Sequence, residues 1–250
     1  MFHLLPRENI VYFGDTGRVP YGGRSAETIV RYARQDVAFL RSFDLKAIVI
    51  ACGTVSTTAL SVLKDENAIP ILGVVEPAAR AAAEATRNGR IGVIGTKATI
   101  RSGAYENAIR ALKPDAVLSA KACPLLVPLV EEGRVRRGDR VAERVVAEYL
   151  TELKDKGVDT LVLGCTHYPL LSAVIGDFMG KDVTLIDTGE QAARATAALL
   201  KKEDRLNTAQ EEGRRRYYAS DSAADFAAMA SMFLGSDITE CAEHIAIEEY

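Results

Sequence analysis

Two cysteines in matching surroundings are the residues of this chain best suited to proton-transfer chemistry. Cys52 and Cys165 each follow a short apolar run and one small residue, and each has a threonine within the next two positions. A thiolate can remove a proton from carbon and a thiol can return one. The pKa of a thiol also falls at the N-terminus of a helix. Two such thiols on opposite faces of one carbon would invert its configuration.

The other two cysteines give no comparable signal. Cys123 precedes Pro124 without polar neighbours, so we interpret it as structural, and Cys241 lies among acidic residues that would raise its pKa. A single cysteine after an apolar strand is more often a buried apolar residue than a catalyst. The paired context of Cys52 and Cys165 is what favours function. No CxxC pair occurs, which argues against a zinc ribbon or a thioredoxin-type motif.

Composition excludes several classes of protein. The chain has 250 residues, 48% hydrophobic and 26% charged, which is enough for one large domain or two small ones. The net charge of −3 argues against nucleic acid or an anionic membrane as the partner. No apolar run approaches the roughly 18 residues that a membrane-spanning helix needs, and no signal peptide is recognisable. We therefore expect a cytoplasmic protein with reduced thiols.

Apolar runs alternate with amphipathic segments along the chain, which predicts an α/β fold with mainly parallel sheets. The predicted strands are residues 10–13, 47–51, 71–75, 91–94, 116–119, 160–164 and 183–186. The predicted helices are residues 26–43, 55–66, 78–87, 102–112, 141–156, 168–176 and 190–201. Ligands of such folds bind beyond the carboxyl ends of the strands, and both cysteines of the pair lie at that position.

The two cysteine-bearing strands also indicate an internal repeat. The second half begins with an extra strand and helix, residues 91–94 and 102–112, that have no counterpart in the first half. We expect that one strand and one helix are absent before residue 10. The strand at residues 10–13 would then lack a neighbouring strand in its sheet.

Several motifs resemble those of glutamate racemases. They are residues 12–16 with 19–22, 76–77, 91–96 with 98–100, 123–125 with 128–131, and 163–170. The run Cys-Thr-His-Tyr-Pro at residues 165–169 is the most specific of them. The resemblance is continuous from about residue 5 to residue 200 and weaker over residues 217–234.

The resemblance implies two pseudo-symmetric α/β domains with the active site in the cleft between them. We expect residues 1–76 plus 186–250 to form the first domain and residues 77–185 the second. The activity implied is interconversion of L- and D-glutamate without pyridoxal phosphate, another cofactor or a metal. It would supply D-glutamate for peptidoglycan, and the enzyme would be a homodimer.

The resemblance also implies roles for individual residues. Cys52 and Cys165 would be the acid and base, and His167 would tune the protonation of Cys165. Asp15 and Glu131 would be supporting carboxylates, although the adjacent Glu132 leaves open which glutamate points inward. The residues that would bind substrate are Tyr21, Gly22, Gly53, Thr54, Thr96, Thr166 and His167.

Two departures from the family pattern stand out. The family begins with a strand ending in Asp-Ser-Gly, which this chain lacks, in agreement with the element missing from the repeat. The family also follows its first cysteine with Asn-Thr, where this chain has Gly53 and Thr54. Gly53 keeps a backbone N–H but no amide side chain, and a water could take the place of that amide.

Three other interpretations stay open at this point. A related two-cysteine racemase could act on aspartate or a hydantoin. A cysteine hydrolase could use Cys165 as nucleophile and His167 as base, which would leave Cys52 unexplained. A catalytically impaired homologue could bind glutamate without turnover, and such a binder would be unaffected by Cys52→Ser.

Overall fold

The computed structural model describes residues 1–234, 238 and 241–250, and it divides into two compact units. Unit 1 contains Met1–Val49, Ala59–Leu72 and Ala193–Tyr250. Unit 2 contains Ile50–Thr58 and Gly73–Ala192. Both members of the cysteine pair therefore belong to unit 2.

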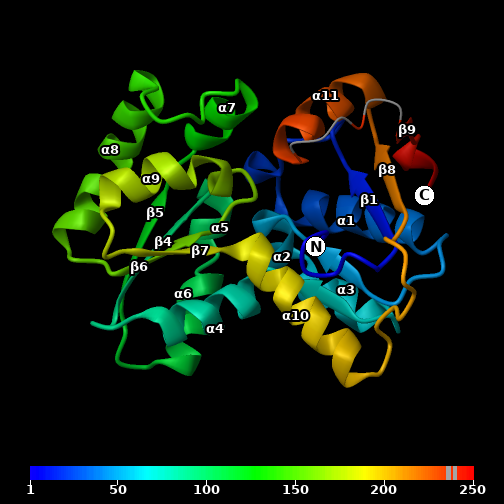
Figure 1. Ribbon diagram of the computed structural model, residues 1–250, viewed down its shortest axis with the longest axis horizontal. Helices are drawn as coiled ribbons and strands as arrows, with labels where there is room; N and C mark the ends of the chain where they lie inside the picture. The colour runs from blue at the N-terminus through cyan, green and yellow to red at the C-terminus, as the bar shows by residue number, and fades with distance from the viewer. Residues whose placement is uncertain (235–237, 239–240) are drawn as a thin grey trace. The chain divides into compact units, whose positions relative to one another are not determined.

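A four-stranded parallel sheet forms the centre of unit 2 (Figure 1). Its order is β5 (Val117–Ala122), β4 (Arg90–Gly95), β6 (Thr160–Leu163) and β7 (Thr184–Asp187). The two inner strands are buried along almost their whole length, because helices cover both faces of the sheet. This burial explains why β4 and β6 are nearly continuous apolar runs in the sequence.

Helices α4 (Val75–Ala85) and α6 (Ala104–Leu112) cover one face of this sheet, and α8 (Arg140–Asp155) and α9 (Ser172–Met179) cover the other (Figure 1). The short helices of the unit are α2 (Gly53–Thr58), α5 (Lys97–Arg101), α7 (Leu126–Glu131) and the 3₁₀ turn η2 (Tyr168–Leu171). Each short helix follows a strand or a neighbouring loop. They place the polar residues of the sequence motifs at one end of the sheet.

Two predicted boundaries in this region were wrong for identifiable reasons. The strand predicted at 71–75 ends at Gly73 in β3 (Ile71–Gly73), and α4 already begins at Val75. Pro77 lies in the first turn of α4, where a missing N–H costs no hydrogen bond, so it does not delay the helix. Between the predicted strand 91–94 and the predicted helix 102–112, where residues 95–99 were expected to be a loop, the structure has α5, because the side chain of Thr96 accepts a hydrogen bond from the N–H of Thr99 and caps the helix.

Unit 1 has its own parallel sheet, in the order β1 (Ile10–Gly14), β8 (Arg215–Ala219) and β9 (Ala242–His244). Helices α1 (Ala26–Leu40), α3 (Leu60–Glu66) and α11 (Ala223–Leu234) and the short turns η1 (Tyr21–Gly23) and η3 (Ile247–Glu249) complete the unit. Rings of Phe13, Phe39, Phe43 and Tyr218 pack against one another with centroids 5.2–5.6 Å apart. In the part of the chain that the structure describes, β1 pairs only with β8 and is the outermost strand of its sheet.

Three elements contain residues of both units: β2 (Ile48–Ile50), β3 and α10 (Thr188–Lys202). Strands β2 and β3 form a separate two-stranded sheet, and β2 leads directly to Cys52. The α/β class with parallel sheets, predicted from the alternation of apolar and amphipathic segments, is confirmed.

Candidate active site

The two cysteines of the pair occupy equivalent positions at the ends of strands in unit 2. Cys52 lies between β2 and α2, and Cys165 follows β6 after one glycine. Neither cysteine forms a disulfide bond. Cys52 is half-buried, whereas Cys165 keeps only 7% of its surface exposed. The strand-to-helix placement inferred from the sequence is therefore present in the structure.

Glycines next to the cysteines bring the two turns into backbone contact. A Cβ atom on Gly53 would lie 2.7 Å from the carbonyl oxygen of Gly164, far inside normal contact distance. Gly164 is confined in turn by β4, since its N–H donates to the carbonyl of Ile94 at 2.8 Å and a Cβ on it would lie 2.7 Å from the same oxygen. The backbones flanking Cys52 and Cys165 can approach this closely only because residues 53 and 164 have no side chain.

Burial keeps Cys165 protonated when no ligand is bound. Burial, followed by the neighbouring Cys52 and Glu131, raises the pKa of the thiol, which is about 12 in all. Hydrogen bonds from the N–H of His167 and the side chain of Thr166 act in the opposite direction. Cys165 is thus poised to give a proton, and it needs a nearby proton acceptor or a cation before it can serve as a base.

The imidazole of His167 lies beside that thiol. Its Nδ1 lies 3.9 Å from Sγ of Cys165 and 3.3 Å from the hydroxyl of Thr166, and its Nε2 lies 3.4 Å from a carboxylate oxygen of Glu131. Burial lowers the pKa of His167, which favours the neutral ring, although Glu131 opposes this effect. With Nε2–H directed at Glu131, Nδ1 is left as an acceptor facing Cys165.

The contact with His167 distinguishes the two adjacent glutamates. Glu131 is the last residue of α7 and reaches the imidazole, whereas Glu132 is the C-cap that follows it; both glutamates are exposed. The sequence left this choice open. The structure brings Glu131, His167 and Cys165 together in one chain of contacts.

Threonine hydroxyls form a second group beside Cys52. The hydroxyl of Thr54 lies 3.1 Å from that of Thr96, which lies 3.0 Å from that of Thr99. Thr54 and Thr99 are buried, and Thr96 is half-buried at the N-terminus of α5. Thr54 and Thr96 were predicted from the sequence, but Thr99 was missed. Its position three residues after a capping threonine is the signal that could have revealed it.

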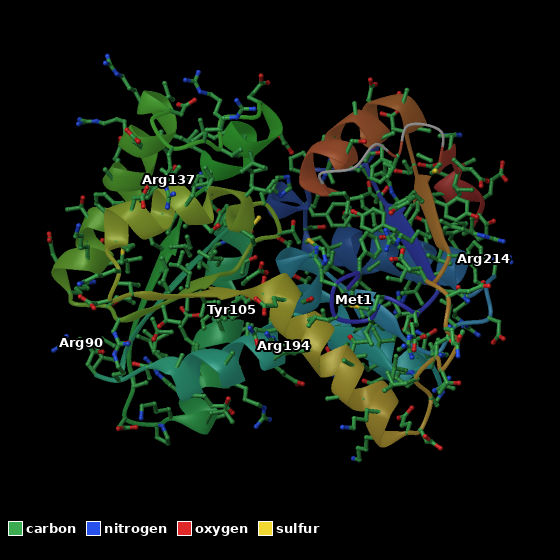
Figure 2. The ribbon with its side chains drawn as sticks, viewed as in Figure 1. Met1, Arg90, Tyr105, Arg137, Arg194 and Arg214 are labelled. Atoms are coloured by element: carbon green, nitrogen blue, oxygen red, sulfur yellow. The ribbon has the colours of Figure 1, made fainter. Side chains whose placement is uncertain are left out.

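Tyr105 is a further residue that the sequence analysis missed. It is fully buried in unit 2, where its ring lies 3.2 Å from the position of a Cβ on Gly164 (Figure 2). Burial raises its pKa, and the charges of Cys165 and Cys52 raise it further. Tyr105 and Ile109 are four residues apart on α6 and look like an ordinary apolar helix face, so no pattern marked Tyr105 as part of the site.

The remaining predicted residues, Asp15, Tyr21 and Gly22, lie in unit 1. The carboxylate of Asp15 accepts hydrogen bonds from Nε of Arg18 at 2.8 and 2.9 Å, from the hydroxyl of Ser220 at 2.7 Å and from the hydroxyl of Tyr21. Gly22 follows Tyr21 in the turn η1 and is half-buried. Asp15 therefore organises its own loop, and Arg18 and Ser220 are the members of this group that the sequence did not reveal.

Among the residues that the structure describes, no group of three or more His, Cys, Asp or Glu side chains is arranged to hold a metal ion. No helix in the described ranges is long and apolar enough to span a membrane.

Comparisons with known proteins agree with this arrangement. The family model described as Asp/Glu/Hydantoin racemase matches residues 4–196. A glutamate racemase of Geobacter metallireducens is 47% identical over 234 residues, 94% of this chain and 86% of that protein.

Solved structures give the same result. A glutamate racemase of Bacillus anthracis superposes with a TM-score of 0.90 at 37% identity, over 98% of this chain and 90% of that one. The enzyme of Francisella tularensis in complex with D-glutamate gives a TM-score of 0.89 at 35% identity, over 100% of this chain and 92% of that one. The family resemblance inferred from the motifs is confirmed.

Proposed function

The chain belongs to the Asp/Glu/hydantoin racemase family, and from that membership we propose that it is a glutamate racemase, an isomerase that interconverts L- and D-glutamate. The observation that carries the proposal is the backbone contact between the turns that bear Cys52 and Cys165. Because that contact holds together the two turns that bear the thiols, we expect a single substrate carbon to face both cysteines. The D-glutamate formed would supply peptidoglycan synthesis.

The reaction needs one thiolate and one thiol. The thiolate removes the proton from Cα, and the electron pair of that bond remains on Cα as a carbanion stabilised by the adjacent carboxylate. The other thiol then delivers its proton to the opposite face of Cα. The proton count is unchanged, and the two cysteines have exchanged roles. The next substrate molecule of opposite configuration restores the starting state.

Cys165 enters this cycle as a thiol. To act as a base it must lose its proton, and the neutral Nδ1 of His167 at 3.9 Å is placed to receive it. Glu131 stabilises the imidazolium that results. The ammonium group of a bound amino acid would lower the pKa of Cys165 further, since an adjacent cation favours a thiolate. We therefore assign His167 and Glu131 to controlling the protonation of Cys165.

Polar groups around the cysteines supply contacts for the substrate. Thr54 and Thr96 present hydroxyls beside Cys52, and Thr166 presents one beside Cys165. Gly53 offers its N–H, as the resemblance implies. Tyr21 and Gly22 remain proposed substrate contacts from unit 1, and Asp15 remains a proposed supporting carboxylate.

The test is α-proton exchange in deuterated water, starting separately from L- and D-glutamate. We expect deuterium at Cα together with inversion from both enantiomers. Cys52→Ser and Cys165→Ser should each abolish inversion, whereas Cys241→Ser, which changes an exposed thiol, should not. Aspartate and a hydantoin are the comparison substrates. Binding of glutamate without exchange would contradict the proposal and support the impaired-homologue interpretation.

The family resemblance also suggests an oligomeric state and a cellular location. We propose a homodimer in the cytoplasm, following the family resemblance and the commonness of two-fold dimers. Sedimentation equilibrium of the purified chain tests the dimer, and a single species at the monomer mass would exclude it.

A further inference from the structure

Arg18 is a buried cation whose three side-chain nitrogens are all engaged. Nε donates to both oxygens of Asp15, Nη1 donates to Oε1 of Gln35 at 2.5 Å, and Nη2 donates to Oδ1 of Asp36 at 2.7 Å. The guanidinium carbon also lies 4.3 Å from the centre of the Tyr32 ring. Only 8% of Arg18 is exposed, and its hydrogen bonds described above all go to other side chains of the protein.

The same network reaches the turn that is proposed to contact glutamate. The hydroxyl of Tyr21 donates to Asp15 and lies 3.4 Å from Oδ2 of Asp36. Tyr21 is 93% buried in this position, with its ring tilted against that of Tyr32 at a centroid distance of 5.9 Å. The residue beside Gly22 is therefore held by two carboxylates that Arg18 bridges.

The loop is fastened from two elements that are distant in sequence. Gln35 and Asp36 belong to α1, which follows the loop, whereas Ser220 follows β8 near the other end of the chain. Ser220 accepts a hydrogen bond from the N–H of Gly17 at 2.9 Å and donates to Asp15 at 2.7 Å. Both contacts fix the backbone between Asp15 and Tyr21.

A buried network of this kind defines one geometry. Buried charges are costly unless each has a partner, so any displacement of the loop that separates Arg18 from Asp15 or Asp36 leaves an uncompensated charge. Apolar packing could also stabilise this loop, but it would restrict the orientation of the side chains less than these hydrogen bonds do. Because Arg18 is buried and binds the side chains that surround the loop, we infer that it affects substrate binding through the position of the loop.

We propose that Arg18 and Asp36 are positioning residues, which hold the Tyr21–Gly22 turn in the geometry that binds glutamate. This role rests on the proposed racemase function. It predicts that loss of the network raises the KM for glutamate more than it lowers kcat, since substrate contact is impaired while the cysteines are untouched.

The test compares variants that break the network with variants that keep it. Arg18→Lys retains a charge but cannot reach Asp15, Gln35 and Asp36 together, and Asp36→Leu removes both contacts of Asp36. Asp36→Asn keeps an acceptor for Arg18. We expect KM to rise about tenfold or more in the first two variants and to change about twofold at most in Asp36→Asn.

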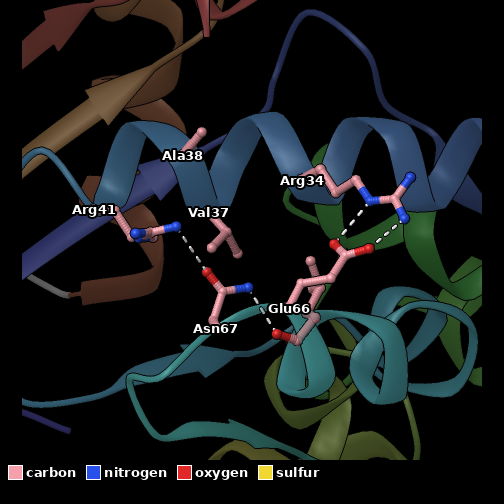
Figure 3. Close-up of a pocket in the computed structure, with 7 residues that line it drawn as sticks. Arg34, Val37, Ala38, Arg41, Glu66 and Asn67 are labelled. Atoms are coloured by element: carbon pink, nitrogen blue, oxygen red, sulfur yellow. Dashed lines mark hydrogen bonds and ion pairs between the residues drawn. The ribbon is translucent and has the colours of Figure 1, made fainter.

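The matched control is another ion pair on the same helix. Arg34 on α1 donates to Glu66 of α3 at 2.9 and 2.5 Å, near the contact of Arg41 with Asn67 (Figure 3). Both side chains of the pair are largely exposed. Arg34→Gln thus removes a charge from α1 without touching the network, and it should leave KM and kcat unchanged.

A second readout keeps this proposal separate from the function it rests on. Hydrogen exchange of the peptide covering residues 18–24 should accelerate in Arg18→Lys and in Asp36→Leu but not in Arg34→Gln. Equal protection in all variants, or a lower Tm with KM unchanged, would overturn the positioning role. A wild-type chain that exchanges no α-proton would instead overturn the racemase function, while the protection data would still decide whether the network holds the turn.

A double variant tests whether Arg18 acts by compensating the charges of Asp15 and Asp36. Arg18→Gln leaves Asp15 and Asp36 without their shared cation, so it should be the most damaging single change. Adding Asp36→Asn removes one of the two carboxylates and should recover part of the loss in KM. Strictly additive effects would show that Arg18 and Asp36 do not act together.

Discussion

Gly53 and Gly164 touch through their backbones, with the position of a Cβ on Gly53 only 2.7 Å from the carbonyl oxygen of Gly164. Each glycine adjoins one cysteine of the proposed pair. The separation of the two thiols is therefore set by a contact that tolerates no side chain. The family pattern has asparagine at the position of Gly53. In this chain the close approach of the two turns requires a glycine there.

The first prediction concerns Gly53→Ala. The added methyl group must push the two turns apart, because the opposing atom is backbone and cannot rotate away. We expect kcat to fall at least tenfold and unfolding free energy to fall by about 1–3 kcal/mol. Urea denaturation measures the unfolding free energy. Circular dichroism of the glutamate solution follows racemisation and gives kcat.

Gly176→Ala is the control for that substitution. Its new Cβ would meet a side-chain carbon of Leu185 at an ordinary 3.7 Å, and the residue lies within α9. Alanine should therefore be neutral or slightly stabilising there. Gly53→Asn carries the same Cβ as Gly53→Ala, so it should impair the enzyme as well. An asparagine variant with wild-type activity would show that the glycine contact does not limit catalysis.

Most of unit 2 could be predicted because its signals are local. The buried runs of β4 and β6 are visible as apolar segments, and the residues following Cys165 match a specific motif. Arg18 was missed because its partners Gln35 and Asp36 are brought to it by the packing of α1, and a lone arginine in a loop carries no pattern. Glu131 and Glu132 are adjacent in the sequence, so the sequence alone does not show which of them reaches His167. That depends on how the last turn of α7 is oriented.

The second prediction concerns Glu131→Gln. Glu131 raises the pKa of His167 against the lowering effect of burial, so its removal makes the imidazole a weaker proton acceptor. We expect kcat to fall about tenfold to a hundredfold with KM little changed, as measured from both enantiomers. Glu132→Gln changes the exposed neighbour and should behave as wild type. Equal losses in the two variants would exclude a specific role for Glu131.

The third prediction concerns Thr54→Val, which keeps the shape of a buried side chain but removes the hydroxyl bonded to Thr96. We expect KM to rise about tenfold, because Thr96 loses one of the two hydroxyls that orient it. Thr151→Val removes an exposed hydroxyl that bonds only the preceding turn of α8, and it should not affect KM. Unchanged KM in both variants would remove Thr54 and Thr96 from the substrate site.

The fourth prediction concerns the pH dependence of stability. Burial and, after it, the charge of Asp15 raise the pKa of Asp36 to about 7 against the lowering effects of Arg18 and Tyr21. In the unfolded chain the pKa would be about 3.9. Between these values the folded protein holds a proton that the unfolded chain has released, so the contribution of Asp36 to stability is complete below about pH 4 and is lost as the pH rises through 7.

Asp36→Asn removes this titration while keeping an acceptor for Arg18. Unfolding free energies of the wild type and the variant, measured in urea from pH 4 to pH 8, should therefore diverge in favour of the variant, by an amount on the order of a few kcal/mol. The divergence should begin above about pH 4 and level off above about pH 7, since both states of the wild type are then ionised. Parallel curves over this range would mean that Asp36 is ionised throughout, with its charge fully compensated by Arg18.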